Sequence, residues 1–174
     1  MMRSRSEVQA LVLRAARGAG LPLGHAENVA RAAAAALARD PACAGGIAAA
    51  LSAPAPAAFS IVGDRLHLVV TPVIWAGPMI RDALDAGAVR IVAAGVDCPA
   101  LLAAMMPDAT LTWNGAEAIV ESVADATPPP VPRGPVDIDA VAWAALEALA
   151  ARTLVPETDL SRIAGAGAGV RDTH

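Results

Sequence analysis

FSIVGDRLHLVV (Phe59–Val70) and TLTWNGAEAIVESV (Thr110–Val123) are the two stretches that decide the fold class. In each of them, strand-forming residues flank a turn that contains glycine, which is the pattern of a β-hairpin. Gly63-Asp64 forms the turn of the first hairpin, and Asn114-Gly115 forms that of the second. Because a hairpin joins antiparallel neighbours, the two stretches favour a mixed or antiparallel sheet over a purely parallel one.

Helices are predicted between these hairpins and on both sides of them. The other elements expected are helices over about 4–18, 25–39, 42–51, 79–86, 99–106 and 137–152, and a strand over 89–94. Charge-free Ala53–Ala58 and proline-rich Thr127–Pro135 are predicted to be linkers, the second a rigid spacer. We therefore predict a single domain, 1–174, with an α+β fold, and α/β is the alternative. Its parts are an N-terminal helical unit (1–52), an α+β core with a small mixed or antiparallel sheet (59–126), and a C-terminal helix with a Gly-Ala tail (136–174).

The spacing of apolar side chains predicts which face of three helices is buried. Ser4 and Glu7 have the spacing of a capping box at the start of the first helix. The residues expected to face the core are Val8, Leu11, Val12 and Ala15 in the first helix, Ala26, Val29, Ala30, Ala33 and Leu37 in the second, and Ile138, Val141, Ala145, Leu146 and Leu149 in the last.

The composition argues against several classes of protein. Alanine provides 45 of the 174 residues, so we expect a core of closely packed small side chains. A net charge of -4 and only four aromatic residues argue against a nucleic acid partner, and Arg3, Arg5, Arg14 and Arg17 are expected to form a solvated helix face. Prolines and glycines interrupt the long uncharged runs, and no apolar segment of a signal peptide precedes Ser6. We therefore predict a soluble, cytoplasmic protein with no membrane partner.

Two places have residue types that can support nucleophilic catalysis. Folding the first hairpin about its turn places Ser60 opposite His67, but no acid is positioned to orient the imidazole, so we interpret them as cross-strand neighbours. Cys98 would begin a helix, where the helix dipole lowers a thiol pKa, whereas the neighbouring Asp97 opposes that effect. A packed cysteine is the favoured interpretation, and the sequence assigns no catalytic residue.

No group of side chains matches the spacing of a metal site. His25 begins the second helix, and nearby Glu27 and Arg31 are four residues apart, so we expect them to pair with each other. Cys43 and Cys98 are far apart in the sequence and give no disulfide framework. We therefore predict neither a metal nor a cofactor.

Glycines alternate with alanines at positions 165, 167 and 169. A dinucleotide-binding loop would need a strand before them and a helix after them, and only five residues follow. In an extended backbone the three glycines would share one side, so another element or a ligand could approach that bare side closely. Structural docking, a ligand loop and a loose tail are the three interpretations of this segment.

Several stretches at the two ends of the chain form a pattern that can be recognised. They are Ala15–Gly20 (AARGAG), Gly24 with Ala26 and Glu27, Leu149–Thr153 (LAART), Pro156, Ser161-Arg162, Gly165–Gly169 (GAGAG) and Asp172. This pattern resembles an uncharacterised bacterial family, domain of unknown function 3726. The resemblance implies no reaction, substrate or cofactor.

The chain departs from that family at four places. Leu23 stands where the family tends to have tryptophan, Asn28 where it tends to have a second acid, and Leu154 where it prefers tyrosine. The family's last residues are rich in aspartate, whereas this chain ends in Arg171–His174. An activity that used the second acid or the tyrosine is therefore not implied here.

The leading hypothesis is a small-molecule-binding protein, which could also be an enzyme, with a site for an anionic metabolite. The site would lie where the glycine segment meets the end of the first helix, and the residues assigned to it are Arg17, Gly18, Gly20, Ser161, Arg162, Gly165, Gly167 and Gly169. The arginines would neutralise the anion, and the glycine amides would form an anion nest. The alternative is a non-catalytic accessory or assembly protein, in which the alanine-rich helices and the glycine segment pack in a homo-oligomer.

Overall fold

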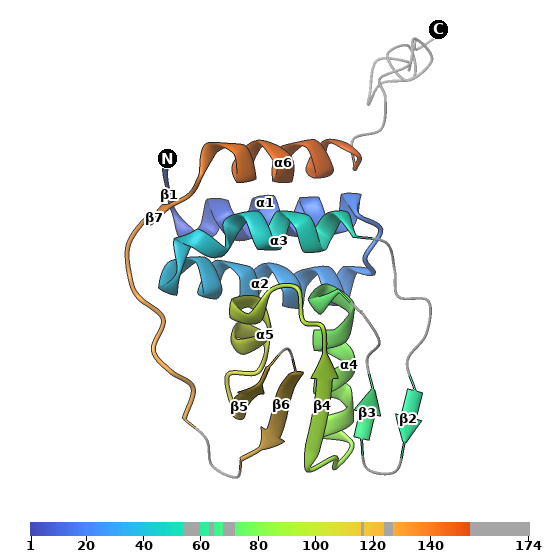
Figure 1. Ribbon diagram of the computed structural model, residues 1–174. Coiled ribbons are helices and arrows are strands. Elements are labelled where there is room, and N and C mark those ends of the chain that lie inside the picture. The colour runs from blue at the N-terminus through green and yellow to red at the C-terminus, as the bar shows by residue number, and fades with distance from the viewer. Residues whose placement is uncertain (54–59, 63–64, 68–71, 116, 124–126, 154–174) are drawn as a thin grey trace, which may run out of the picture.

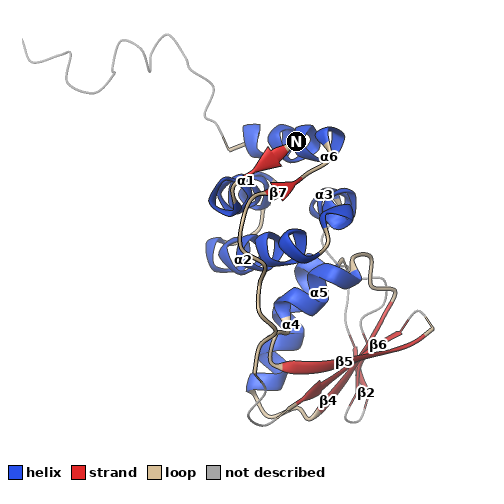
Figure 2. Cartoon of the chain, turned by 90° about the vertical axis from the view of Figure 1, so that its left-hand side faces the viewer, coloured by secondary structure: helices blue, strands red, loops and turns tan. Residues whose placement is uncertain are grey.

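The computed structural model describes residues 1–53, 60–62, 65–67, 72–115, 117–123 and 127–153. These residues form six α-helices, one 3-10 helix and three small antiparallel sheets, which confirms the predicted α+β class. Helices α1, α2, α3 and α6 are stacked in layers, and α4 and α5 lie between this stack and the strands β2 to β6 (Figures 1 and 2).

The elements have the following bounds along the chain. The helices are α1 (Arg5–Gly18), α2 (Leu23–Arg39), the 3-10 helix η1 (Pro41–Cys43), α3 (Ala44–Ser52), α4 (Val73–Asp85), α5 (Pro99–Met105) and α6 (Ala140–Ala151). The strands are β1 (Met2–Arg3), β2 (Ser60–Val62), β3 (Arg65–His67), β4 (Arg90–Ala94), β5 (Ala109–Asn114), β6 (Glu117–Ser122) and β7 (Val136–Asp137).

Helix α1 begins with the capping box that the sequence predicts. The backbone N–H of Glu7 donates to Ser4 Oγ at 3.2 Å, and the N–H of Ser4 donates to Glu7 Oε2 at 2.8 Å. Ser4 Oγ also donates to Glu7 Oε2 at 2.7 Å, and this bond, together with the one from the Ser4 N–H, lowers the pKa of the Glu7 carboxyl. Every residue predicted to face the core from α1 and α2 is buried, so the helical spacing predicts both faces correctly.

Both predicted hairpins are present. Strands β5 and β6 pair antiparallel, and β4 pairs with the other edge of β6. The turn lies one residue later than predicted, because Asn114 still pairs with Glu117 and Gly115 is the residue with a left-handed φ of +60°. In the first hairpin the register pairs Ser60 with His67 and Ile61 with Leu66, as predicted. The predicted pair of Phe59 and Leu68 lies outside the described residues.

Helix α4 starts six residues before the predicted Met79, at Val73, and continues through Pro78. Asp97 holds its first turn, since Asp97 Oδ1 accepts a hydrogen bond from the N–H of Val73 at 2.9 Å. A proline in a helix lacks one backbone donor, but Val73, Ile74 and Ile80 are all buried here. Burial of this apolar face stabilises the helix more than the missing hydrogen bond weakens it.

The buried face of α6 differs from the predicted one. Ile138, Leu146 and Leu149 are buried as expected, whereas Val141 is 78% exposed and Ala145 is also exposed. The face is set by Trp143, whose ring lies 4.6 Å from the guanidinium carbon of Arg3 and whose Nε1 donates to Glu147 at 2.8 Å. Because α6 is apolar on nearly every side, the spacing of its apolar residues could not identify which side is buried.

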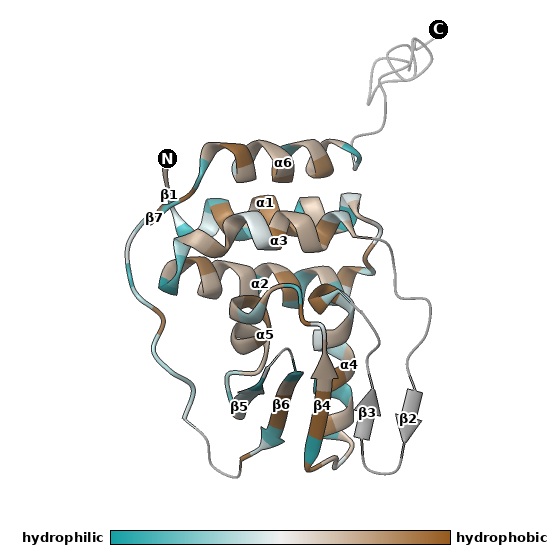
Figure 3. Ribbon diagram, in the orientation of Figure 1, coloured by the Kyte–Doolittle hydropathy of each residue, from teal (hydrophilic) through white to brown (hydrophobic). Residues whose placement is uncertain are grey.

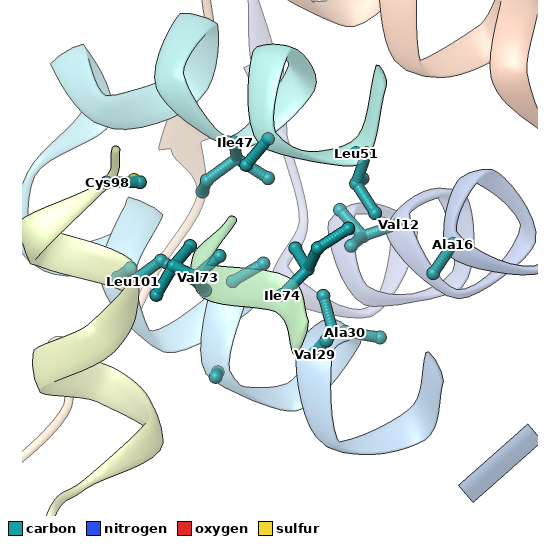
Figure 4. Packing of buried hydrophobic residues seen from close by; sticks show 14 of the residues in the cluster. Val12, Ala16, Val29, Ala30, Ile47, Leu51, Val73, Ile74, Cys98 and Leu101 are labelled. Carbon is teal, nitrogen blue, oxygen red and sulfur yellow. The ribbon is translucent and has the colours of Figure 1, made fainter. Parts of the chain in front are cut away.

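One continuous hydrophobic cluster joins the helical stack to the sheet. Its members around α3 and α4 include Ile47, Leu51, Ile74 and Leu101, which point toward one another in Figure 4. A short pairing that the sequence does not predict, β1 with β7, ties the first residues of the chain to the segment before α6. Within the described ranges, no helix combines the length and the apolar character that a bilayer crossing requires.

Gly18 sets the distance between α1 and α6. A Cβ atom at this position would lie 1.9 Å from the carbonyl oxygen of Leu149 and 2.8 Å from its carbonyl carbon. No side-chain rotation can relieve such a contact, since the obstructing atoms belong to the backbone of α6.

Gly18→Ala should therefore force α6 away from α1 and lower the free energy of unfolding by about 3 kcal/mol. Gly24→Ala is the matched control, because Gly24 is also helical and nothing lies within 4 Å of its Cβ position. The control should be neutral or stabilising by up to about 1 kcal/mol. Urea denaturation followed by circular dichroism measures both changes. Equal stability of the two variants would contradict this packing.

Candidate functional site

The site predicted from the sequence lies only partly within the described residues. Arg17 is at the end of α1, where its Nη1 donates to the carbonyl oxygen of Leu21 at 3.2 Å. Gly18 packs on α6, and Gly20 has a left-handed φ of +91° in the turn to α2. Ser161, Arg162, Gly165, Gly167 and Gly169 lie outside the described residues, so the role assigned to them stays a prediction.

A shallow hollow of about 400 Å³ lies beside Arg17. Its walls are Leu13, Arg14, Arg17, Leu23 and Thr153. The described part of the chain therefore brings Thr153, just after α6, next to the arginines at the end of α1. This is the place where the sequence predicts that the C-terminal segment meets α1.

A larger cleft of about 550 Å³ lies elsewhere, between α2, α4, the end of α5 and the proline-rich segment before β7. The residues that line it are Arg5, Asn28, Arg31, Ala32, Ala35, Arg39, Gly77, Pro78, Arg81, Ala104, Met105, Met106, Pro107, Asp108, Pro128, Pro129 and Val131. We call it the arginine cleft. Figure 2 shows the loop that leads into β7 running past α4 and α2, and Pro128, Pro129 and Val131 belong to this loop.

The charges of the arginine cleft are unbalanced. Among the described lining residues, four arginines and one aspartate give a formal charge of +3. Arg81 is neutralised locally, because it forms ion pairs with Asp108 and with Asp85, the latter at 2.9 Å. The hydrogen bond from Arg81 lowers the pKa of the Asp108 carboxyl and raises the pKa of the guanidinium. This part of the wall is fixed and close to neutral.

The other three arginines supply the excess positive charge. Among the described residues, Arg5, Arg31 and Arg39 form no ion pair. Arg39 Nη2 donates to the carbonyl oxygen of Pro129 at 2.8 Å, which holds the proline-rich segment against the end of α2.

Arg31 does not pair with Glu27, so that prediction is wrong. Its Nη1 lies 3.4 Å from Asn28 Oδ1 instead, and both residues line the arginine cleft. An exposed carboxylate four residues away gains little from pairing, so a neighbouring amide can compete with it for the guanidinium.

The remaining wall of the cleft is apolar and closely fitted. A Cβ atom at Gly77 would lie 2.3 Å from Met105 Sδ, so the absence of a side chain at Gly77 lets Met105 lie against α4. Met106, next in the chain, is 2% exposed.

The other candidates from the sequence have ordinary structural surroundings. Cys98 is buried at the start of α5, and burial raises the pKa of its thiol despite the nearby helix amides. Burial likewise raises the pKa of Cys43 to about 12. Neither thiol is therefore activated for nucleophilic attack. Across the described ranges, no three metal-binding side chains gather in one place.

The arginine cleft could not be found from the sequence, although part of it could be suspected. Arg5 was expected to lie on a solvated face, and it is indeed exposed, but it also borders the cleft. Asn28, Arg31 and Arg39 follow one another on one face of α2. That polar stripe was the feature of the sequence that could indicate a site here. The segments that complete the cleft around it come from distant parts of the chain.

The chain is similar to one protein family at its N-terminal end. The model of the family described as "Protein of unknown function (DUF3726)" matches residues 3–39, which span α1 and α2. This confirms the resemblance predicted from Ala15–Glu27, whereas the stretches after α6 lie outside the matched residues. No curated protein and no solved structure matches the chain. Arg5, Arg31 and Arg39 all lie within the matched segment.

The contribution of the Arg81–Asp108 ion pair to the free energy of unfolding should depend on pH, which allows its role in the cleft wall to be tested. Both side chains are about 40% exposed, so Asp108→Asn should lower the free energy of unfolding by only about 0.5–1 kcal/mol at pH 7. The pKa of Asp108 is lowered in the folded protein, so its contribution is present above the ordinary aspartate pKa. It is lost as the pH falls below about 4.

Urea titrations from pH 7 down to pH 2.5 should show the stabilities of wild type and Asp108→Asn converging. Asp82→Asn is the control, since Asp82 is next to Arg81 on α4, is exposed and forms no ion pair among the described residues. A difference that stays constant down to the lowest pH would refute the assigned role of Asp108.

Proposed function

We propose that this protein binds an anionic small molecule and that the arginine cleft is its binding site. The observation that supports this most strongly is that Arg5, Arg31 and Arg39 border one cleft without an ion-pair partner among the described residues. A volume of about 550 Å³ is within the range of small-molecule sites. The whole chain has a net charge of -4, so the excess of positive charge in this cleft is local and does not follow from the overall composition.

Guanidinium groups suit this role for a physical reason. Each presents several N–H donors in a plane that matches the two oxygens of a carboxylate or phosphate, and each stays charged at any physiological pH. Like charges that share a cleft repel one another, so an anion between them both removes the repulsion and gains hydrogen bonds. The field is strongest within the cleft, where water is partly replaced by the apolar wall.

The sequence and the structure suggest two different locations for the same kind of ligand. The sequence-based location is the junction of Arg17 with the C-terminal segment, and the shallow hollow beside Arg17 is consistent with it. The arginine cleft is larger and has more positive charge, so we place the ligand there. Variants of single arginines can separate the two locations.

A thermal-shift screen against carboxylates, phosphates and nucleotides should identify a ligand, and isothermal titration calorimetry would then measure its dissociation constant. Arg31→Gln should weaken binding by about 10-fold to 100-fold, because it removes a charge-assisted hydrogen bond of about 1.5–3 kcal/mol. Arg17→Gln and Arg162→Ala should leave the dissociation constant unchanged. Arg90→Gln, in an exposed pair with Glu121 on the sheet, controls for the loss of any positive charge.

The opposite pattern, with binding lost in Arg17→Gln or Arg162→Ala and kept in Arg31→Gln, would move the site to the end of α1. A screen in which no anion raises the melting temperature would overturn the proposal for both locations.

The outer face of α6 supports a second candidate function, assembly with further copies of the chain. Val141 is 78% exposed there, and Ala144, Ala145 and Ala148 are exposed beside it. Figure 3 shows that α6 has little hydrophilic colour along most of its length. A small, smooth apolar helix face can pack closely on a copy of itself, so this face supports the assembly hypothesis.

Light scattering coupled to gel filtration tests the assembly candidate. A dimer or larger species in the wild type that becomes a monomer in Val141→Glu would support assembly through α6. Ala103→Glu, on the exposed side of α5, is the control for an added acid. A monomeric wild type at high protein concentration would exclude this candidate.

A further inference from the structure

The arginine cleft has a composition that selects among anions. Eleven of the seventeen described residues that line it are apolar, and the only polar side chains among them besides the four arginines are Asn28 and Asp108. Both of these already accept hydrogen bonds from arginines of the same wall. Among the described residues, the lining contains no serine, threonine or tyrosine and no aromatic ring. It thus has little to offer a sugar hydroxyl and no platform for stacking a base.

The backbone of the cleft is poorly suited to a phosphate. Phosphate sites commonly use backbone N–H groups in nests or at helix N-termini. Four of the lining residues, Pro78, Pro107, Pro128 and Pro129, have no backbone N–H at all. The guanidinium groups are therefore the strongest hydrogen-bond donors that the described lining offers an anion.

Helix dipoles also favour a low charge on the ligand. Arg39 is the last residue of α2, and Ala104 and Met105 are the last two of α5, so two helices present their C-terminal ends to the cleft. The C-terminal end of a helix has partial negative charge and opposes an anion, more strongly when the anion carries two charges. Among the described helices, α1 alone has its first residue, Arg5, in the lining of the cleft.

We infer that the arginine cleft binds an aliphatic carboxylic acid, with its carboxylate on Arg31 and Arg39 and its hydrocarbon chain on the apolar wall around Met105. This inference rests on the proposed function and adds the class of ligand. Methionine thioethers are flexible and polarizable and so adapt to chains of different shape. The proline rings and alanine methyl groups supply the rest of the apolar surface.

A series of straight-chain carboxylates from butanoate to decanoate tests the inference by calorimetry at constant ionic strength. Each buried methylene should tighten binding about threefold to fourfold until the apolar wall is covered. 1-Octanol tests the need for the charge, and hexyl phosphate, AMP and glucose 6-phosphate test the class. Octanoate should bind at least 10-fold more tightly than each of the other four compounds.

Two variants separate the contributions of charge and chain. Arg31→Gln should weaken the binding of every carboxylate by a similar factor, so that the dependence of affinity on chain length is preserved. Met105→Gln, which keeps nearly the same volume, should leave butanoate unchanged and reduce the gain per methylene. Leu23→Gln is the matched control, because Leu23 is 56% exposed and lines the hollow beside Arg17 instead. Circular dichroism confirms that each variant is folded.

The outcomes distinguish this inference from the proposed function. Binding of AMP or a sugar phosphate, lost in Arg31→Gln, with no binding of carboxylates, would overturn the ligand class and leave the anion site standing. The ligand class would also be overturned if carboxylates bind but affinity does not rise with each methylene. The same holds if that rise in affinity is lost only in Leu23→Gln. No binding of any of these anions would overturn both.

Discussion

Close packing of helices through small side chains is the constraint on which the rest of the structure depends. Helix α1 lies between α2 and α6, and the approach of α6 requires the missing side chain at Gly18. Alanine gains little from burial on its own, so a core of this kind is stable only where backbones come near enough for many weak contacts. The same need for a missing side chain applies at Gly77, because a Cβ atom there would collide with Met105, which packs against α4. The larger of the two described cavities lies where α4 and the end of α5 meet α2, away from the close packing of α1 on α6.

Local features of the fold could be predicted from the sequence because a few residues determine each of them. A capping box needs only Ser4 and Glu7, and a hairpin needs alternating strands around one glycine turn. Helices α1 and α2 have a charged side and an apolar side, so their buried faces could be predicted. Helix α6 lacks that contrast, and its face depends on one ring, Trp143, and on the distant Arg3. Pro78 signals a break, and only the buried surroundings of α4 explain why the helix continues.

The arginine cleft has a different origin, which explains why the sequence did not predict it. Its lining comes from α1, α2, α4, the end of α5 and the segment before β7, and no spacing rule connects those segments. On the sequence, Arg31 and Arg39 are ordinary outward residues of an amphipathic helix. They line one cleft because the proline-rich segment lies across from them, held by the hydrogen bond from Arg39 to Pro129. The role of Ser161, Arg162 and the three alternating glycines continues to rest on the sequence.

The residues that line the arginine cleft fall into two groups, those inside the family match at 3–39 and those outside it. The matched segment holds the three unneutralised cations, whereas Met105, the prolines and Asp108 lie outside it. Charge and shape are thus encoded by separate stretches of one chain. If the proposed site is correct, a protein that shares α1 and α2 but differs elsewhere would keep these three cations beside a cleft of another shape. The positive charge of the cleft and its shape could therefore vary independently of each other.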